Sequence, residues 1–367
     1  MSAEQPNPTC RSIAQKAGVS VATVSLALRN DPRISAPVRE RIQQLAVEMG
    51  HRPNPLLSAY QASVRSKKPA AFRATLGWLN DHPEKDFWRK PWTEPLWEGA
   101  HGRARELGYE LDEIWFPEIR VEEPEENVRK IQKILRARGI AGVILPSLNR
   151  AQHLVQPWDG FAVVCIGGHH HFVEHSTIRV KTIYEHHTVN PDALYNIHLA
   201  FEKLREGGRK RIGLAIPKYF EHESERGYSS GFLRSQMDLP TAQRVPILFS
   251  DETAQVEAWA RKHRPDAVIC SHSEVAAGIR SVGIKVLGDT KLVHLNLASD
   301  VAGWSGIDQR RSMLGRAAVD MLTAHLIRND VGVPACAKHM RIEGVWVDGA
   351  PESMVTTKIL RNRPASL

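Results

Sequence analysis

The sequence predicts two kinds of structure in one chain: a small all-α segment at the N-terminus and a large α/β body of two parallel-sheet lobes. The first observation is charge, because residues 1–70 carry ten Lys and Arg against four Asp and Glu and so hold +6 of the net +8 of all 367 residues. The second is a change of pattern near residue 71, where short amphipathic helices give way to apolar strands that alternate with amphipathic helices.

Two short helices joined by a tight turn are expected in the basic segment. Residues 11–18 have apolar side chains at helical spacing, and Gly18 can leave that helix with a positive φ. Ser20 suits the N-cap of a second helix over 21–29, and a third follows over 36–49. Such helices on a basic segment are typical of a helix-turn-helix that binds DNA. A small bundle that docks a protein partner is the alternative.

The run SIAQKAGVSVATVS at 12–25, continued in register over 34–55, resembles the headpiece of lac repressor-type (LacI/GalR) regulators. This resemblance implies that the second helix enters the major groove of DNA. The residues that it places against bases or phosphates are Ser20, Val21, Ala22, Thr23, Ser25, Leu26 and Arg29. Since three of these are apolar, we expect few hydrogen bonds to bases and more contact with thymine methyl groups.

A hinge is expected over residues 53–70, between a headpiece of residues 1–52 and the body. The resemblance implies a hinge helix that folds on DNA and inserts an apolar side chain into the minor groove. Asn54, Leu56, Leu57 and Tyr60 are the candidate contacts, and Tyr60 stands where the family typically has leucine. A plain linker is the alternative interpretation.

The body, residues 71–350, is predicted to contain repeated strand–helix units in two halves. Strands are expected over 74–79, 109–115, 142–145, 161–166, 211–215, 267–270 and 292–295. Helices are expected over 95–107, 126–138, 192–205, 276–282 and 311–327. The resemblance extends through this body and implies a periplasmic-binding-protein-like fold of two lobes that senses a small molecule, followed by a C-terminal tail of residues 351–367.

A ligand site is expected in the crevice between the lobes, at the carboxyl ends of the strands. Sugar recognition needs aromatic faces and polar groups, and the candidates are Asn80, Asp81, Trp88, Trp92, Arg226, Tyr228, His272 and Asn296. Departures from the family pattern leave open a different carbohydrate, a derivative, or no ligand.

Two catalytic interpretations are weaker. The letters of a nucleophile elbow, GYSSG at 227–231, follow a polar segment that we expect to be a loop instead of the required strand. Histidines at 169–171, 175, 186 and 187 lack clear metal-ligand spacing. We therefore predict no enzyme activity, no cofactor and no metal.

Together these patterns predict a homodimeric transcriptional repressor that binds a pseudo-palindromic double-stranded DNA operator and responds to a sugar-like effector. No signal peptide or membrane span is expected, and the four separated cysteines indicate buried, reduced thiols, so a cytoplasmic location is predicted. A solute-binding protein without DNA function is the main alternative, and a hydrolase the lesser one.

Overall fold

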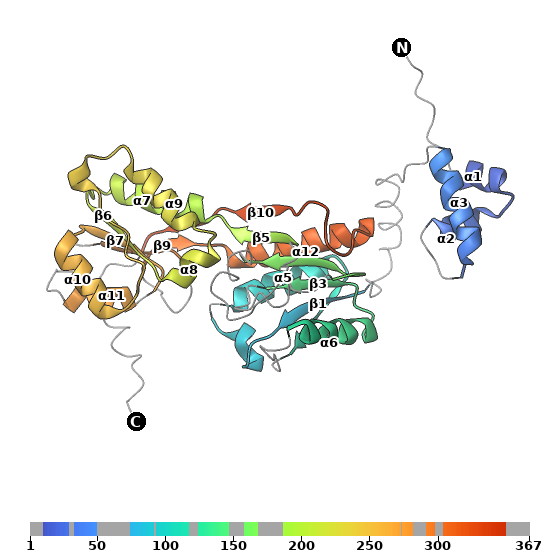
Figure 1. Cartoon of the computed structure of the whole chain (residues 1–367), viewed down its shortest axis with the longest axis horizontal. Helices are drawn as coiled ribbons and strands as arrows, with labels where there is room; N and C mark the ends of the chain where they lie inside the picture. Colours follow the sequence, from blue (N-terminus) through green and yellow to red (C-terminus); the bar gives the residue numbers. More distant parts are fainter. Residues whose placement is uncertain are drawn as a thin grey trace, which may run out of the picture. The chain divides into compact units, whose positions relative to one another are not determined.

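The computed structural model describes residues 10–28, 33–49, 74–91, 93–116, 124–146, 158–167, 186–272, 274–281, 291–297 and 304–349 (Figure 1). Contacts divide the chain into two compact units, Met1–Ala71 and Phe72–Leu367. No helix among these described residues is long and apolar enough to cross a membrane.

Three helices form the described part of the first unit: α1 (Cys10–Ala17), α2 (Val21–Ala27) and α3 (Ala36–Glu48). Their bounds lie within two residues of the predicted ones. The side chains buried between them are Ile13, Ala14, Val24, Ala27, Ile42 and Ala46. Gly18 has a φ of +68°, so it ends α1 in the left-handed conformation that its missing Cβ allows.

The first lobe of the body contains a six-stranded sheet with the strand order β10-β5-β4-β3-β1-β2, and every neighbouring pair is parallel. Its strands are β1 (Thr75–Asn80), β2 (Glu110–Trp115), β3 (Gly142–Leu145), β4 (Ala162–Ile166), β5 (His187–Pro191) and β10 (His339–Ile342). Helices α5 (Glu94–Glu106) and α12 (Arg311–Arg328) cover one face, and α6 (Pro124–Ala137) covers the other (Figure 1).

The second lobe contains a five-stranded sheet with the order β11-β9-β8-β7-β6, in which only β11 is antiparallel to its neighbour. Its strands are β6 (Ile212–Ala215), β7 (Ala267–Cys270), β8 (Lys291–His294), β9 (Ser305–Asp308) and β11 (Val345–Val347). Its helices are α7 (Ala193–Glu206), α8 (Lys218–Glu223), α9 (Gly227–Gln236), α10 (Thr253–His263) and α11 (Glu274–Ser281). Separate apolar clusters pack against its two faces.

The chain passes between the lobes three times: from β5 to α7, from β9 to α12, and from β10 to β11. Helix α12 therefore belongs to the first lobe but begins where a second-lobe strand ends. It crosses α5 closely, because Gly99 of α5 faces the Ser312 backbone and Gly315 faces the Leu96 backbone. The chain passage from β9 and the close contact with α5 together fix where α12 starts relative to both sheets.

The structure confirms two parallel-sheet lobes and corrects several details of the prediction. In the polar segment 221–226, which was expected to be a loop, residues 221–223 belong to helix α8 and residues 224–226 form a turn. Strands β5, β9, β10 and β11 and helix α10 were not among the predicted elements. Among the cysteines, Cys165 and Cys270 are buried as expected, but Cys336 is exposed because it precedes an edge strand.

Candidate functional site

The turn between α1 and α2 carries the candidate DNA-binding face. Ser20 is the N-cap of α2 and accepts a hydrogen bond from the Thr23 backbone N–H at 3.0 Å, while the two side-chain oxygens lie 2.8 Å apart. Val21 is 45% exposed, and Ala22 beside it is also exposed. The first turn of α2 therefore presents small and apolar side chains to solvent, as a base-reading surface of this composition would require.

Side chains from α3 hold the two short helices in place. Arg41 donates to the Ala17 carbonyl at 3.2 Å and Gln43 donates to the Ala27 carbonyl at 2.9 Å, so both helix ends have a partner from α3. Ser25 and Leu26 are half-buried on α2. Arg29 and the hinge candidates Asn54, Leu56, Leu57 and Tyr60 lie outside the described residues.

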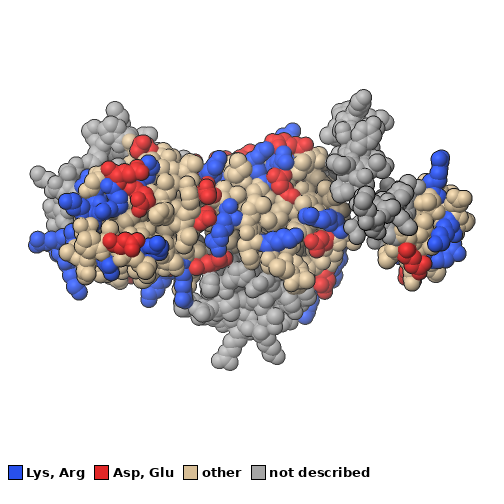
Figure 2. Space-filling view, turned by 90° about the horizontal axis from the view of Figure 1, so that it is seen from above, with Lys and Arg blue, Asp and Glu red and all other residues tan. Residues whose placement is uncertain are grey.

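Charge distinguishes the two units on the face seen in Figure 2. Lys and Arg are the more prominent charged side chains on the headpiece, whereas both signs are interspersed over the body. Arg11, Lys16, Arg33 and Arg41 are exposed headpiece cations. Such a distribution suits binding to phosphates, which supplies most of the sequence-independent affinity for DNA.

The body holds a cavity of about 360 Å³, lined by residues from both lobes. First-lobe lining residues follow the ends of β4 and β5, and second-lobe lining residues follow β7, β8 and β9. The cavity thus lies at the carboxyl ends of both parallel sheets, where ligands of such folds bind. Its size is that of a small-molecule site.

Aromatic rings form much of the cavity wall. Phe87 and Trp88 come from the 3-10 helix η1 (Lys85–Arg89), and Tyr219, Phe220 and Tyr228 come from α8 and α9. Phe220 stacks on Tyr228 with centroids 5.1 Å apart and planes 8° from parallel, which fixes both rings. Ring faces of this kind pack against the C–H patches of a sugar as well as against other planar ligands.

Hydrogen bonds between polar side chains position several of the residues that line the cavity. The Tyr228 hydroxyl accepts from Gln309 at 2.9 Å, and Asn296 Oδ1 accepts from Arg311 Nη2 at 2.9 Å. The His272 ring lies between Ser271 Oγ, 2.7 Å from Nδ1, and the Tyr219 hydroxyl, 2.5 Å from Nε2. Burial lowers the pKa of His272, so this ring is neutral at neutral pH.

Four of the eight predicted ligand contacts line this cavity: Trp88, Tyr228, His272 and Asn296. Asn80 is fully buried outside it and donates to the Lys85 carbonyl at 2.9 Å and to Glu113 at 2.6 Å, so it supports the segment that carries Trp88. Asp81 is also buried and does not line the cavity. Arg226 is exposed and does not line the cavity, although its neighbour Glu225 does. Trp92 lies outside the described residues.

Sequence reasoning missed the cavity's arginines, Arg311 and Arg341, and its Glu225. Arg311 opens a predicted helix directly after Asp308, Gln309 and Arg310, so its place after a strand end was a usable signal. Arg341 lies on β10, a strand of four mostly exposed residues that is too short to be recognised from its sequence pattern.

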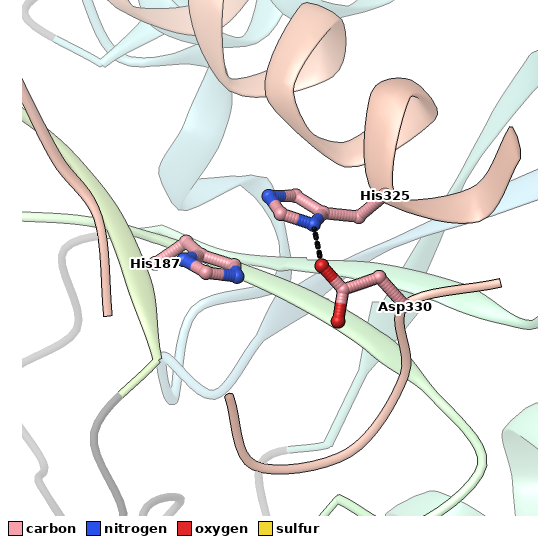
Figure 3. Close-up of side chains that lie close together, drawn as sticks. All are labelled: His187, His325 and Asp330. Atoms are coloured by element: carbon pink, nitrogen blue, oxygen red, sulfur yellow. Dashed lines mark hydrogen bonds and ion pairs between the residues drawn. The ribbon is translucent and has the colours of Figure 1, made fainter. Parts of the chain in front are cut away.

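A second cluster lies at the other end of α12, where the rings of His187 and His325 stack with centroids 4.0 Å apart and planes 10° from parallel (Figure 3). His325 Nδ1 lies 2.7 Å from Asp330 Oδ2. One atom of each of the three residues lies within 4.8 Å of the others, a spacing that a metal ion could bridge. The position of the proton on the His187 ring argues against metal binding at this cluster.

The Lys338 backbone N–H donates to His187 Nδ1 at 3.0 Å, so neutral His187 carries its proton on Nε2. A histidine that binds metal normally donates from its other ring nitrogen instead, and parallel rings do not aim two lone pairs at one ion. The cluster is therefore better suited to tie α12 to β5 and β10. Of the histidines that the sequence analysis set aside as metal ligands, His169, His170, His171 and His175 lie outside the described residues.

Acid is expected to destabilise the body through His186 and His187, whose pKa values burial lowers from 6.5 to about 4. Both stay neutral in the folded chain but gain protons in the unfolded one, so stability falls as pH drops from 6.5 towards 4. In His187→Asn, the amide oxygen can still accept from Lys338. This variant should lose roughly half of the pair's pH dependence of Tm. An unchanged slope, equal to that of the exposed control His198→Asn, would contradict this prediction.

Known proteins resemble this chain in sequence. Residues 9–54 match the family model described as bacterial regulatory proteins, lacI family. The transcriptional regulator GalR of Streptococcus thermophilus is 27% identical over 340 residues, which cover 87% of this chain and 93% of GalR. GalR of Salmonella typhimurium strain LT2 is 24% identical over 302 residues, covering 78% of each chain.

Solved structures share the fold. The CelR–cellobiose complex has a TM-score of 0.54 at 17% identity, covering 94% of this chain and 100% of CelR. The lac repressor bound to ONPG has a TM-score of 0.51 at 15% identity, covering 94% and 99%. A helix-turn-helix headpiece before a two-lobed periplasmic-binding-protein-like body defines a class of DNA-binding transcriptional regulators. Within that class, the headpiece matches the lacI family of bacterial regulatory proteins, and the chain as a whole is similar to the GalR regulators.

Proposed function

We propose that the chain acts as a homodimeric repressor in the cytoplasm, where it binds a pseudo-palindromic operator and is controlled by a carbohydrate-like effector in the cavity between its lobes. The observation that carries this proposal is the cavity itself, which draws its lining from both lobes at the carboxyl ends of both sheets. A ligand there can favour one arrangement of the lobes, but only by its difference in affinity for the two states.

Relatives support the choice of ligand class. CelR was solved as a cellobiose complex, and the lac repressor was solved with ONPG and, in another structure, with operator DNA. The chain would act by binding instead of catalysis. Ser229 of the GYSSG run follows helix α8 instead of a strand, so the elbow that activates a hydrolase serine is not formed.

Selection of duplexes from a random palindromic library, followed by gel shift at increasing salt, tests the DNA-binding part. We expect one repeated half-site to be enriched and its affinity to fall steeply with salt, since phosphate contacts release counterions. Enrichment of no half-site, or binding that salt leaves unchanged, would contradict the proposal. A body that is stabilised by sugars but enriches no duplex would instead support a solute-binding protein.

A further inference from the structure

The loop between α8 and α9 lines the cavity in a strained conformation. Two consecutive residues that carry side chains have positive φ angles, Glu225 at 54° and Arg226 at 59°. This left-handed region is unfavourable for residues with a Cβ unless the surroundings enforce it. Such strain is concentrated at ligand clamps and switch regions. Backbone hydrogen bonds from Glu225 to the His222 carbonyl and from Arg226 to the Glu221 carbonyl, both 3.0 Å, close this loop, and a side-chain contact adds to them.

One contact of this kind joins the two lobes. Glu225 of the second lobe accepts a hydrogen bond from Arg341 Nη2 on β10, in the first-lobe sheet, at 3.1 Å. Both residues line the cavity. Their side chains are 22% and 42% exposed, respectively, so a ligand that enters the cavity can reach the pair. The ion pair closes one edge of the cavity and couples the strained loop to the other lobe.

The charges of the described lining residues favour an anion. Arg311 and Arg341 are the cations, Glu225 is the anion, and His272 is neutral. Arg311 donates through Nε and Nη2 to the amide oxygen of Asn296, a neutral acceptor that orients the guanidinium without opposing its charge. A guanidinium presents a planar fork of donors that matches a carboxylate or a phosphate.

We propose that the ligand of this cavity carries an anionic oxygen group, a carboxylate or a phosphate, which replaces Glu225 on Arg341. The Glu225–Arg341 pair is then a latch between the lobes that the ligand opens by exchange. Once the Glu225 carboxylate is displaced, Glu225 and Arg226 can leave the left-handed conformation and the lobes lose this link. A neutral sugar offers Arg341 only hydroxyl oxygens, which lack the negative charge needed to replace a carboxylate in a charge-assisted pair. This inference rests on the proposed function of the cavity as an effector site.

The test compares sugars that share one ring skeleton on the full-length protein. D-glucose, D-glucuronate and glucose 6-phosphate, and the matching D-galactose series, are titrated by calorimetry and thermal shift at constant ionic strength, with inorganic sulfate as the minimal anion. We expect an anionic member to bind more tightly than its neutral parent, with the uronate and the phosphate distinguishing the two sources of charge. Sulfate should give a weaker stabilisation.

Three variants assign that binding to the latch. Arg341→Gln should raise the Kd of the anionic ligand by about tenfold or more, the loss of a charge-assisted hydrogen bond. Glu225→Gln removes the competing carboxylate and should lower this Kd. Arg328→Gln, the same change at an exposed arginine outside the cavity lining, should leave it unchanged.

Three results would overturn the proposal: a neutral parent that binds as tightly as its anions, anion binding that Arg341→Gln leaves intact, or no anion in the panel, sulfate included, that stabilises the protein. The first of these would leave the cavity as a neutral-sugar site and the proposed function standing. Failure to enrich any operator would refute the proposed function whatever the outcome with sugars.

Discussion

Ile42→Ala is expected to weaken operator binding by about tenfold or more while leaving the body folded. Ile42 is fully buried among the three headpiece helices. Its truncation should cost about 2–5 kcal/mol, because the lost methyl groups leave a cavity. A core drawn from so few helices has little stability in reserve. Operator affinity should therefore fall by about tenfold or more, as the folded fraction of the headpiece decreases.

Val47→Ala is the matched control, because this residue lies on the same helix but is 78% exposed. A surface substitution of this kind changes stability by about 0.5 kcal/mol or less. Fluorescence anisotropy with a selected duplex measures affinity, and limited proteolysis reports headpiece unfolding without reference to DNA. Wild-type protease resistance of residues 10–49 in Ile42→Ala would show that this core is not what holds the headpiece together.

Gly99→Ala is expected to destabilise the body strongly, whereas Gly102→Ala on the same helix should stabilise it slightly. A Cβ on Gly99 would overlap the backbone of Ser312 in α12. Relief requires a backbone shift, and overpacking of this kind costs about 3 kcal/mol or more, equivalent to a fall in Tm of about 5 °C or more. A Cβ on Gly102 would meet open space, and alanine favours a helix interior by about 0.5–1 kcal/mol.

This pair of variants also tests how α12 serves the cavity. Ser312 is next to Arg311, so a displaced α12 should misplace that guanidinium and weaken ligand binding in Gly99→Ala. Differential scanning fluorimetry gives the two Tm values, and calorimetry with the stabilising ligand gives the affinities. Equal Tm values for the two variants would mean that the close crossing of α5 and α12 is not required.

Local patterns in the sequence were sufficient for the headpiece and for most sheet strands. Gly18, Ser20 and the apolar spacing of α1–α3 act within a few residues of one another, so periodicity and capping rules place the helices. The buried strands β3, β4 and β7 are short apolar runs, which the same rules detect. The crossover strand β10 was not predicted because it has only four residues, most of them exposed, and it pairs with β5, about 150 residues earlier in the chain.

Only some of the residues that line the cavity could be predicted from the sequence, for a related reason. Trp88, Tyr228, His272 and Asn296 were found from their places after strands or beside a helix start, as family resemblance suggested. Arg341 reaches the cavity through an unpredicted strand, and Glu225 reaches it through a left-handed turn that no local preference favours. Local backbone hydrogen bonds close this turn, and the contact of Glu225 with Arg341, which joins residues far apart in the sequence, is seen only in the folded chain.

The most direct test of ligand-gated DNA binding is an anisotropy titration of the full-length protein against its selected palindromic duplex, with and without the sugar that most stabilises the body. Thermodynamic coupling requires the ligand to change operator Kd and the operator to change ligand Kd by the same factor. We expect that factor to be about fivefold or more. A ligand that saturates the cavity yet leaves operator Kd unchanged would contradict the account.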